Sequence, residues 1–316
     1  MHYGGLLHSN EGAALKCIRV GRKRHDYRKK GKRVAGIFMA ILGILWILPI
    51  VWLILSSFKS DSDFITSFAN LKGPLDYLTR LIPDKWTIRN YISVFVGGEG
   101  ANTTANILPM FRNSFVVSIS VTIGTLIVTS LSAYAYERLD FKGGDKIFWV
   151  LMYMSMFPNV VNLLPMFRIC NALGWIDNLN ALIWPSLAGV FNIFLIRNFL
   201  KGIPKDLDEA AAIDGAGSFA IYRHIILPSI KPVLIVVGLF AFNGAWNDLL
   251  WPSIVLTNPA NQTLTPGLRL LSGQYEQKWG LMIASCLISM VPPLTLYLFA
   301  QKYFLEGISV SEGVKG

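Results

Sequence analysis

Long stretches without a charged residue dominate this sequence. Five stretches of about 20 residues contain no Asp, Glu, Lys or Arg, and a sixth contains only Asp248. A helix needs about 20 mostly apolar residues to cross a bilayer, and a backbone in lipid must satisfy its own hydrogen bonds. The stretches therefore predict an all-α, polytopic membrane helix bundle with six transmembrane helices. We expect these helices at residues 34–58, 113–136, 147–167, 178–196, 232–256 and 279–301.

The composition fits a membrane protein and argues against several other classes. Only 15% of the residues are charged and the mean hydropathy is +0.47, whereas a soluble domain carries about 25% charged residues. The formal charge of +10 is also typical of nucleic-acid-binding proteins, but these seldom lack a charged surface elsewhere, so we expect no nucleic-acid partner. The three cysteines and four histidines are too scattered for a disulfide framework or a metal site. The spans contain no evident nucleophile or acid pair, so we expect no enzyme.

The distribution of Lys and Arg predicts the orientation of the spans, because cytoplasmic loops are rich in these residues. Ten lie within residues 1–33, three between the second and third spans, five within residues 197–231, and two after residue 301. These 20 basic residues share one side of the membrane, and the other nine lie on the opposite side. Both termini are therefore expected to be cytoplasmic.

The same pattern divides the chain into three parts. Residues 1–33 are expected to form a basic cytoplasmic N-terminal tail, residues 34–301 the six-span membrane domain, and residues 302–316 a cytoplasmic C-terminal tail. Within the membrane domain, the external loop 59–112 contains Pro and Gly residues that predict a small cap of short helices and loops. The loop 197–231 is cytoplasmic in this arrangement.

Polar residues within the spans are candidates for lining a path through the membrane. Asp248 is the one acidic residue in a span, and a carboxylate at that depth is by default a functional residue; alternatively, it lies at the outer interface in contact with water. Prolines recur in the spans, as they do around the cavities of transporters. Amides and indoles suit a polyhydroxylated ligand, and they equally suit hydrogen bonding between helices. The candidates are Asn159, Asn162, Asn192, Asn243, Trp246, Asn247 and Asp248.

The cytoplasmic loop before the fifth span has an unusual local sequence. Acidic residues at 206–209 complement the positive end of a helix, and the alanines at 210–212 favour a helix with little side-chain bulk. Gly215 permits a turn, and a second helix over 218–227 is expected to stop at Pro228. A helix whose surface carries only small side chains is suited to fit into a cleft in a partner. An ordinary solvated connector does not need such a surface.

These residues carry a resemblance to a known family. Permeases of binding-protein-dependent ABC importers have the pattern Glu-Ala-Ala, three residues, Gly, nine residues, Ile, one residue, Leu-Pro. The chain matches every position of the pattern, with Glu209, Ala210, Ala211, Gly215, Ile225, Leu227 and Pro228. Residues 113–114, 133–139, 244–248, 301–304 and 313–316 look like those of the sugar-importer (maltose-type) members. Within that subfamily the chain resembles the second permease subunit of the pair.

The resemblance implies that the loop 197–231, named the coupling loop from here on, docks on a separate ATPase subunit. The chain itself has no phosphate-binding loop pattern, so we expect ATP and Mg to be bound by partner subunits and no cofactor in this chain. The residues implied in ATPase coupling are Glu209, Ala210, Ala211, Asp214, Gly215, Ile225, Leu227 and Pro228. A second ATPase contact is implied for Gly313, Val314, Lys315 and Gly316.

The function implied by the resemblance is that of a multi-pass permease subunit of an ATP-driven importer in the plasma (inner) membrane of a prokaryote. The implied partners are a second permease subunit in a heterodimer, two ATPase subunits, an extracytoplasmic solute-binding protein and membrane lipid. The implied substrate is a carbohydrate or oligosaccharide. One alternative is an importer permease for a non-sugar polar solute. The other is a secondary transporter, which usually shows inverted repeats or a cluster of ion-binding residues in its spans.

Overall fold

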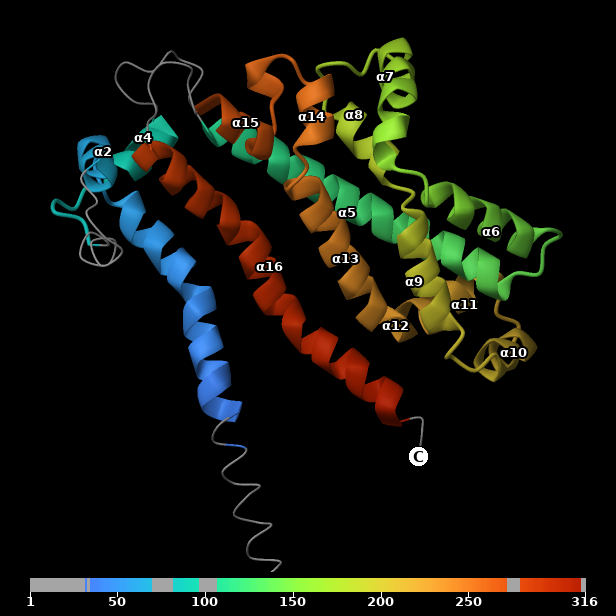
Figure 1. The fold of residues 1–316 in the computed structure, drawn as a ribbon. Helices are drawn as coiled ribbons and strands as arrows, with labels where there is room; N and C mark the ends of the chain where they lie inside the picture. The colour runs from blue at the N-terminus through green and yellow to red at the C-terminus, as the bar shows by residue number, and fades with distance from the viewer. Residues whose placement is uncertain (1–31, 33–34, 70–81, 97–106, 272–278, 314–316) are drawn as a thin grey trace, which may run out of the picture.

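The computed structural model describes residues 32, 35–69, 82–96, 107–271 and 279–313, and all regular elements in these ranges are helices (Figure 1). The first is the helix Ala35–Ser57. It is followed by α2 (Asp61–Ala69), α4 (Arg89–Val96), α5 (Ile107–Arg138), α6 (Gly144–Ser155), η1 (Asn159–Asn162), α7 (Leu163–Ala172), α8 (Asn180–Ile183), η2 (Trp184–Ser186), α9 (Val190–Leu200), α10 (Asp206–Ile213), α11 (Ser218–Ile221), η3 (Tyr222–Ile226), α12 (Leu227–Ser229), α13 (Lys231–Trp246), α14 (Leu250–Val255), η4 (Pro259–Asn261), α15 (Leu264–Leu271) and α16 (Trp279–Gly313).

The helices confirm an all-α bundle of the kind that crosses membranes. Within the described residues, five helices are long and apolar enough to span: Ala35–Ser57, Ile107–Arg138, Asn180–Leu200, Lys231–Val255 and Trp279–Lys302. These five overlap five of the six predicted spans. The helical pair 144–155 and 159–172 makes a sixth span only if its two bent parts are counted together.

The third predicted span, 147–167, is not one continuous helix. Its two halves meet at 96°, because α6 ends at Ser155 and η1 begins just after Pro158. Proline has no backbone N–H to continue the helical hydrogen bonds, and Pro158 itself is extended, with φ −58° and ψ 128°. Proline alone does not force such a break, since α16 passes through Pro292 and Pro293 as one helix.

The central element of the bundle is α5, which packs along α13 and α9 (Figure 1). Small side chains on α5 permit close approach of its neighbours: a Cβ added to Gly124 would lie 2.5 Å from Leu187 Cδ2, in the segment between η2 and α9. The hydroxyl of Thr129 donates to the Thr125 carbonyl of the preceding turn at 2.6 Å, which satisfies a buried polar group within the helix. Small and hydroxyl-bearing residues therefore make up part of the buried face of α5, beside larger apolar side chains such as Met110 and Val117.

Among the described residues, the helix Ala35–Ser57 contacts the rest of the chain at its C-terminal end and diverges from the bundle toward its start (Figure 1). None of its most apolar window is buried. At the held end, Asn90 Nδ2 donates to the carbonyls of Ser57 and Lys59 at 2.7 and 2.8 Å. The short helices α2 and α4 lie at this end, within the predicted loop 59–112. Residues 70–81 and 97–106 of that loop lie outside the described residues, and 107–112 form the start of α5.

At the end of the molecule opposite the coupling loop, Asp177 ties two loops together. Its carboxylate accepts hydrogen bonds from the Thr257 N–H at 2.5 Å, the Thr257 hydroxyl at 2.6 Å and the Asn258 N–H at 2.7 Å. Its backbone has a positive φ of 58°, which Asp tolerates better than most residues. The side-chain bond from Thr257 and the backbone bond from Asn258 hold the pKa of Asp177 below its usual value.

Candidate functional site

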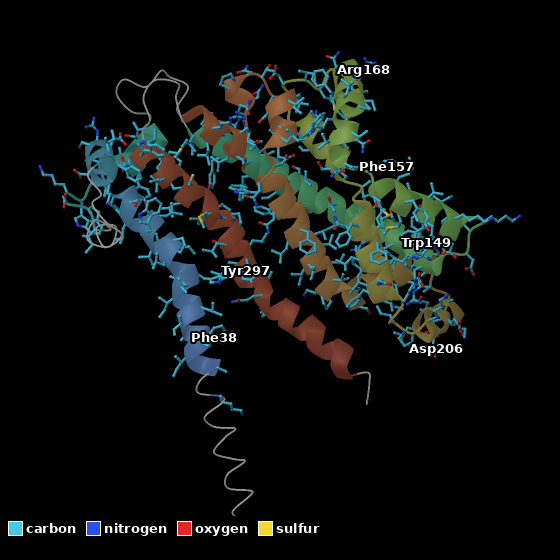
Figure 2. All side chains as sticks on the ribbon, in the orientation of Figure 1. Phe38, Trp149, Phe157, Arg168, Asp206 and Tyr297 are labelled. Carbon is cyan, nitrogen blue, oxygen red and sulfur yellow. The ribbon has the colours of Figure 1, made fainter. Side chains whose placement is uncertain are left out.

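The coupling loop projects from one end of the bundle, with α10 as its outermost helix (Figure 1). Asp206, Asp208 and Glu209 occupy the first turn of α10, where carboxylates complement the unpaired backbone N–H groups of the helix. None of the residues of α10 is buried. Figure 2 places Asp206 at this outer edge, at the opposite end of the molecule from Arg168. The predicted helix in this loop is thus present and exposed.

A glycine turn ends α10 and sets the direction of the chain that follows. Gly215 has a φ of +85°, which glycine adopts without the steric penalty that a Cβ brings. Its N–H donates to the Ala212 carbonyl at 3.0 Å, and the Ala216 N–H donates to the Ala211 carbonyl at 2.9 Å. This pair of bonds is the Schellman motif. The glycine in the sequence pattern is therefore required by backbone geometry.

Apolar side chains project from the coupling loop into the surroundings. Ile213 is 87% exposed, Phe219 is 68% exposed and Leu207 is 49% exposed. The sequence pattern identified Glu209 and Ala210, which are also exposed, but not these three larger side chains. The signal that could have found them is the presence of large apolar residues in a loop expected to be cytoplasmic. An exposed apolar patch on such a loop is typical of a surface that binds another protein.

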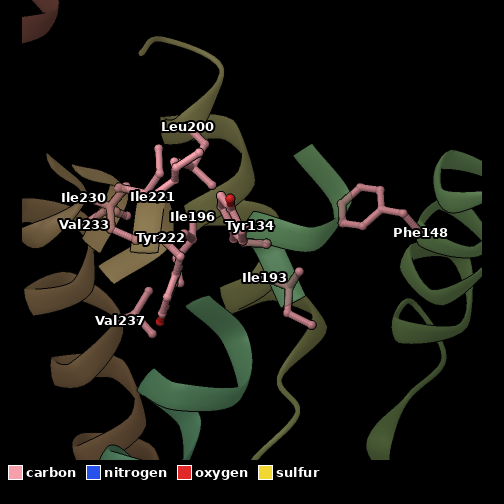
Figure 3. Close-up of a cluster of buried hydrophobic side chains, with 12 residues drawn as sticks. Tyr134, Phe148, Ile193, Ile196, Leu200, Ile221, Tyr222, Ile230, Val233 and Val237 are labelled. Atoms are coloured by element: carbon pink, nitrogen blue, oxygen red, sulfur yellow. The ribbon is translucent and has the colours of Figure 1, made fainter. Parts of the chain in front are cut away.

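The inner limb of the coupling loop consists of α11, η3 and α12, residues 218–229. Several of its side chains are buried and anchor it in the bundle. Ile221, Tyr222 and Ile226 are buried in a cluster with residues of α5, α9 and α13 (Figure 3), and Ile225 and Leu227 of the sequence pattern pack against this cluster. The helical path continues through a five-residue π-helical segment, η3, and through Pro228 to Ser229. The expectation that Pro228 stops the helix is therefore wrong, because this proline lies in the first turn of α12, where a missing N–H costs little.

The pattern residues thus divide between two roles. The outer limb of the coupling loop consists of α10 and the turn at Gly215. On this limb Glu209, Ala210, Asp214 and Gly215 are exposed, whereas Ala211 packs against the buried cluster of the chain itself. Ile225 and Leu227 hold the inner limb, and Pro228 is exposed.

The last turn of α5 holds the coupling loop through Arg138. The guanidinium Nε lies 3.2 Å from Asp208 Oδ2 of α10, and the Arg138 side chain is only 4% exposed. Its Nη2 donates to the carbonyls of Leu200 and Ile203, at 3.2 and 2.8 Å, where the chain leaves α9. A buried charge is costly unless it is paired and hydrogen-bonded. Arg138 is paired by charge with Asp208 and hydrogen-bonded through Nη2, whereas its Nε makes no hydrogen bond.

A second arginine, Arg197, extends from α9 and pairs with acidic residues of α5 and α6. Arg197 of α9 donates through Nε to Glu137 Oε2 of α5 at 2.9 Å and through Nη2 to Asp145 Oδ1 of α6 at 2.5 Å. Its guanidinium lies 4.4 Å from the ring centroid of Phe148. Because Asp145 is 77% exposed and Glu137 only 13%, the bond to Glu137 is the one shielded from water.

The candidate path residues all lie at breaks in the helices. Asn159 and Asn162 are exposed at the two ends of η1, in the bent span, and Asn192 lies in the first turn of α9. The remaining four, Asn243, Trp246, Asn247 and Asp248, lie where α13 gives way to α14. No hydrogen bond joins these three groups to one another within the described part of the chain.

Trp246 occupies a packed position. It is 2% exposed, its ring packs between Phe111 and Phe242, and its Nε1 donates to the Ser289 carbonyl of α16 at 3.0 Å. The neighbouring Asp248 is half-buried and accepts a bond of 3.4 Å from the Trp251 N–H in the first turn of α14. Asn243 is half-buried and Asn247 is exposed. The contacts of Trp246 are therefore structural. The Asn247 side-chain amide donates to the Asn243 carbonyl of the preceding turn at 3.1 Å, and Asn243 and Asp248 lie half-buried beside it.

Two further expectations concern the ends of the chain and metal binding. The helix α16 continues to Gly313, so residues expected to form a tail are helical, while 314–316 lie outside the described residues. The N-terminal tail also lies outside them, except for Lys32. Among the residues that the structure describes, no group of three or more His, Cys, Asp or Glu side chains could hold a metal ion.

A bundle of spanning helices with an exposed helical loop at one end defines a polytopic membrane protein built to contact a partner. The chain belongs to the family of binding-protein-dependent transport system inner membrane components, whose model matches residues 125–310. It is therefore a transport component, as the sequence pattern predicted. The matched range includes the whole coupling loop.

Individual relatives match nearly the full length of the chain. The arabinooligosaccharides transport system permease protein AraQ of Bacillus subtilis is 31% identical, over 93% of this chain and 99% of the relative. The trehalose/maltose transport system permease protein MalG of Thermococcus litoralis is 31% identical over 88% of this chain and 95% of its own. A crystal structure of a bacterial ABC transporter that imports alginate contains a chain with a TM-score of 0.72, 20% identity and 86% coverage of this chain, 95% of its own. That likeness confirms the fold.

Proposed function

We propose that this chain is one of two permease subunits of an ATP-driven importer and forms half of its translocation path. The observation that carries the proposal is the coupling loop, which combines an exposed helix, a fixed glycine turn and exposed apolar side chains at Ile213 and Phe219. In this proposal the outer limb docks in a groove of an ATPase subunit, where Glu209 makes an ionic contact. The inner limb, anchored in the bundle, passes the resulting movement to the spans.

The proposed substrate is a carbohydrate or oligosaccharide. Two relatives that support it are named for arabinooligosaccharides and for trehalose or maltose. A third, the sn-glycerol-3-phosphate permease UgpE of Salmonella choleraesuis, is 29% identical over 90% of this chain and supports the alternative of a non-sugar polar solute. The amides at the break between α13 and α14 suit either class, because hydroxyl groups both donate and accept hydrogen bonds.

The proposed partners are a second permease, two ATPase subunits that bind ATP and Mg, and an extracytoplasmic binding protein. A solved alginate transporter in complex with a pentasaccharide-bound periplasmic protein has this last arrangement, with a TM-score of 0.56 to this chain. We propose no cofactor for the chain itself.

The proposed setting is the plasma (inner) membrane of a prokaryote, with both termini in the cytoplasm. The distribution of Lys and Arg supports this orientation. The arrangement of the fold agrees with it, since the start of the helix Ala35–Ser57, the end of α16 and the coupling loop lie toward the same end of the molecule (Figure 1).

The test is reconstitution of the chain with its co-encoded permease, ATPase and binding protein in liposomes. We expect uptake of labelled malto- or arabinooligosaccharide that requires ATP, and we expect Ile213→Asp to release the ATPase subunits from the purified complex. Leu139→Asp is the matched control, because Leu139 is 40% exposed just after α5 but lies outside the coupling loop. Uptake without ATP would instead indicate a secondary transporter, and uptake of sn-glycerol-3-phosphate alone would support the non-sugar alternative.

A further inference from the structure

We infer that Arg138 is a positioning residue that joins the coupling helix α10 to α5, so that movement of the coupling loop enters the membrane domain through α5. The inference rests on the proposed function, in which a partner subunit moves the coupling loop. The inference concerns the helix through which that movement enters the membrane domain. The order of elements along the chain alone would suggest α13, because α13 is the span that follows the loop.

The contact between α10 and α5 is an ion pair between a buried guanidinium and a half-buried carboxylate. Arg138 Nε lies 3.2 Å from Asp208 Oδ2, and the two side chains are 4% and 18% exposed. The same guanidinium also holds the carbonyls of Leu200 and Ile203. Because separating one partner leaves an unpaired charge in a buried site, α10 and the end of α5 are expected to move together.

The inner limb of the coupling loop is also fixed to α5. The Tyr134 hydroxyl donates to the Ser218 carbonyl at 2.9 Å, and the hydroxyls of Ser130 and Tyr222 lie 2.8 Å apart in a buried hydrogen bond. Both limbs are therefore tied to the last three turns of one helix. In contrast, the covalent route from α10 to α13 passes through the Gly215 turn and the π-helical segment η3.

The far end of α5 holds a loop on the opposite side of the molecule. Asn113 Nδ2 donates to the carbonyls of Ala260 and Gln262, both at 3.1 Å, and Ser114 Oγ accepts from the Leu264 N–H at 2.7 Å. With 32 residues, α5 is about 48 Å long. One rigid helix thus connects the coupling loop with the loop 258–264, on the side where a binding protein would dock.

The test uses Asp208→Asn in the reconstituted complex, because this change removes the charge with little change in shape. We expect the ATPase subunits to stay bound and ATP hydrolysis to continue, while solute imported per ATP falls by about tenfold, a typical coupling between distant sites. Asp208→Glu restores the carboxylate and should restore most of this ratio. The matched control is Asp140→Asn, an exposed carboxylate two residues beyond Arg138, which should import like the wild type.

Other outcomes overturn the inference. A wild-type import ratio in Asp208→Asn would show that the ion pair is not needed, and release of the ATPase subunits would place Asp208 in the docking surface itself. A purely structural role would lower expression, melting temperature and hydrolysis together. If Asp208→Asn does not assemble, Arg138→Lys supplies the same measurement, since one ammonium cannot reach all three oxygens. Failure of the proposed function gives a different result from failure of this inference. If the proposed function were wrong, the wild-type complex would already import solute without ATP.

Discussion

The phenolic hydroxyl of Tyr134 donates a hydrogen bond of 2.9 Å to the backbone carbonyl of Ser218, 84 residues further along the chain. This bond fixes the first residue of α11 to α5 at the point where the coupling loop turns back into the bundle. The Tyr134 ring also packs against Tyr222, with centroids 5.3 Å apart. The two contacts have different chemistry and can be separated by substitution.

Tyr134→Phe removes the hydrogen bond and keeps the ring contact. We expect a loss of about 1 kcal/mol of stability, the usual net value of one buried hydrogen bond, measured as a lower melting temperature of the purified chain. Tyr134→Ala also removes the ring and should cost about 3–5 kcal/mol. Tyr297→Phe is the control, since Tyr297 is 54% exposed on α16; a Tyr134→Phe melting curve that matches this control would contradict the role of the hydroxyl.

Gly215→Asp should abolish transport, whereas Gly217→Asp should be tolerated. The first places a Cβ at a φ of +85°, at a cost of about 1–2 kcal/mol, and disturbs the turn that ends α10. The second places Asp at the N-cap of α11, in an extended conformation that favours such a cap. A Cβ at either position meets no atom within 4 Å, so crowding does not distinguish the pair.

The readout for this pair is transport-coupled ATP hydrolysis, with membrane insertion verified for both variants. If Gly215→Asp retained coupled hydrolysis, the assignment of the coupling loop would be wrong. If Gly217→Asp also lost it, the effect would be one of added charge and not of backbone geometry.

Alanine at Asn243, Asn247 and Asp248 together should raise the KM for solute uptake. These residues offer the polar groups at the break between α13 and α14, and polar groups left without a ligand partner discriminate strongly between solutes. The measurement is initial uptake rate against the concentration of solute-loaded binding protein. Unchanged uptake and unchanged solute dependence in the triple variant would remove these residues from the path. Trp246→Phe is the comparison, because it removes the bond to the Ser289 carbonyl and should reduce stability only.

Asp177→Asn should weaken the link between its loop and Thr257 at neutral pH and have no effect in acid. The folded-state pKa of Asp177 is lowered by its hydrogen bonds, so ionised Asp177 stabilises the fold above the unfolded pKa of about 3.9. This stabilisation is lost as the pH falls through the lower folded value. Asn tolerates the positive φ, so the change isolates the charge.

The measurement is hydrogen exchange of the Thr257 and Asn258 amides, whose N–H groups both bond to this carboxylate. Faster exchange in Asp177→Asn is expected at pH 7, with the difference vanishing once the wild-type carboxyl is protonated. An equal difference at every pH would show that the charge contributes nothing.

The sequence predicted the elements whose cause is local. Runs of apolar residues predicted the spanning helices, and the acid-rich, alanine-rich stretch before Gly215 predicted α10 and its turn, because dipole, propensity and backbone freedom all act within a few residues. The break at Pro158 and the intact helix at Pro292 show where local reasoning ends. The same residue type gives opposite results, since neighbouring helices decide whether the freed backbone groups find partners.

The contacts of the coupling loop could not be predicted because they join residues far apart in the chain. Arg138 and Asp208 are each ordinary surface residues in the sequence, and only the packing of α5 against α9 brings them together in a buried site. Similarly, the sequence makes Trp246 a candidate for solute binding, whereas its position between Phe111 and Phe242 is that of a packed core residue. Amphipathic side chains serve either purpose, and burial distinguishes them.

The separate position of the helix Ala35–Ser57 has a consequence for how the protein is made. Because its apolar window buries nothing against the rest of the chain, this helix can enter the bilayer as soon as it leaves the ribosome, without waiting for α5 or α13. A spanning helix forms its backbone bonds within itself and inserts independently of later association. A helix that inserts by itself is therefore physically distinct from the helices that build the core.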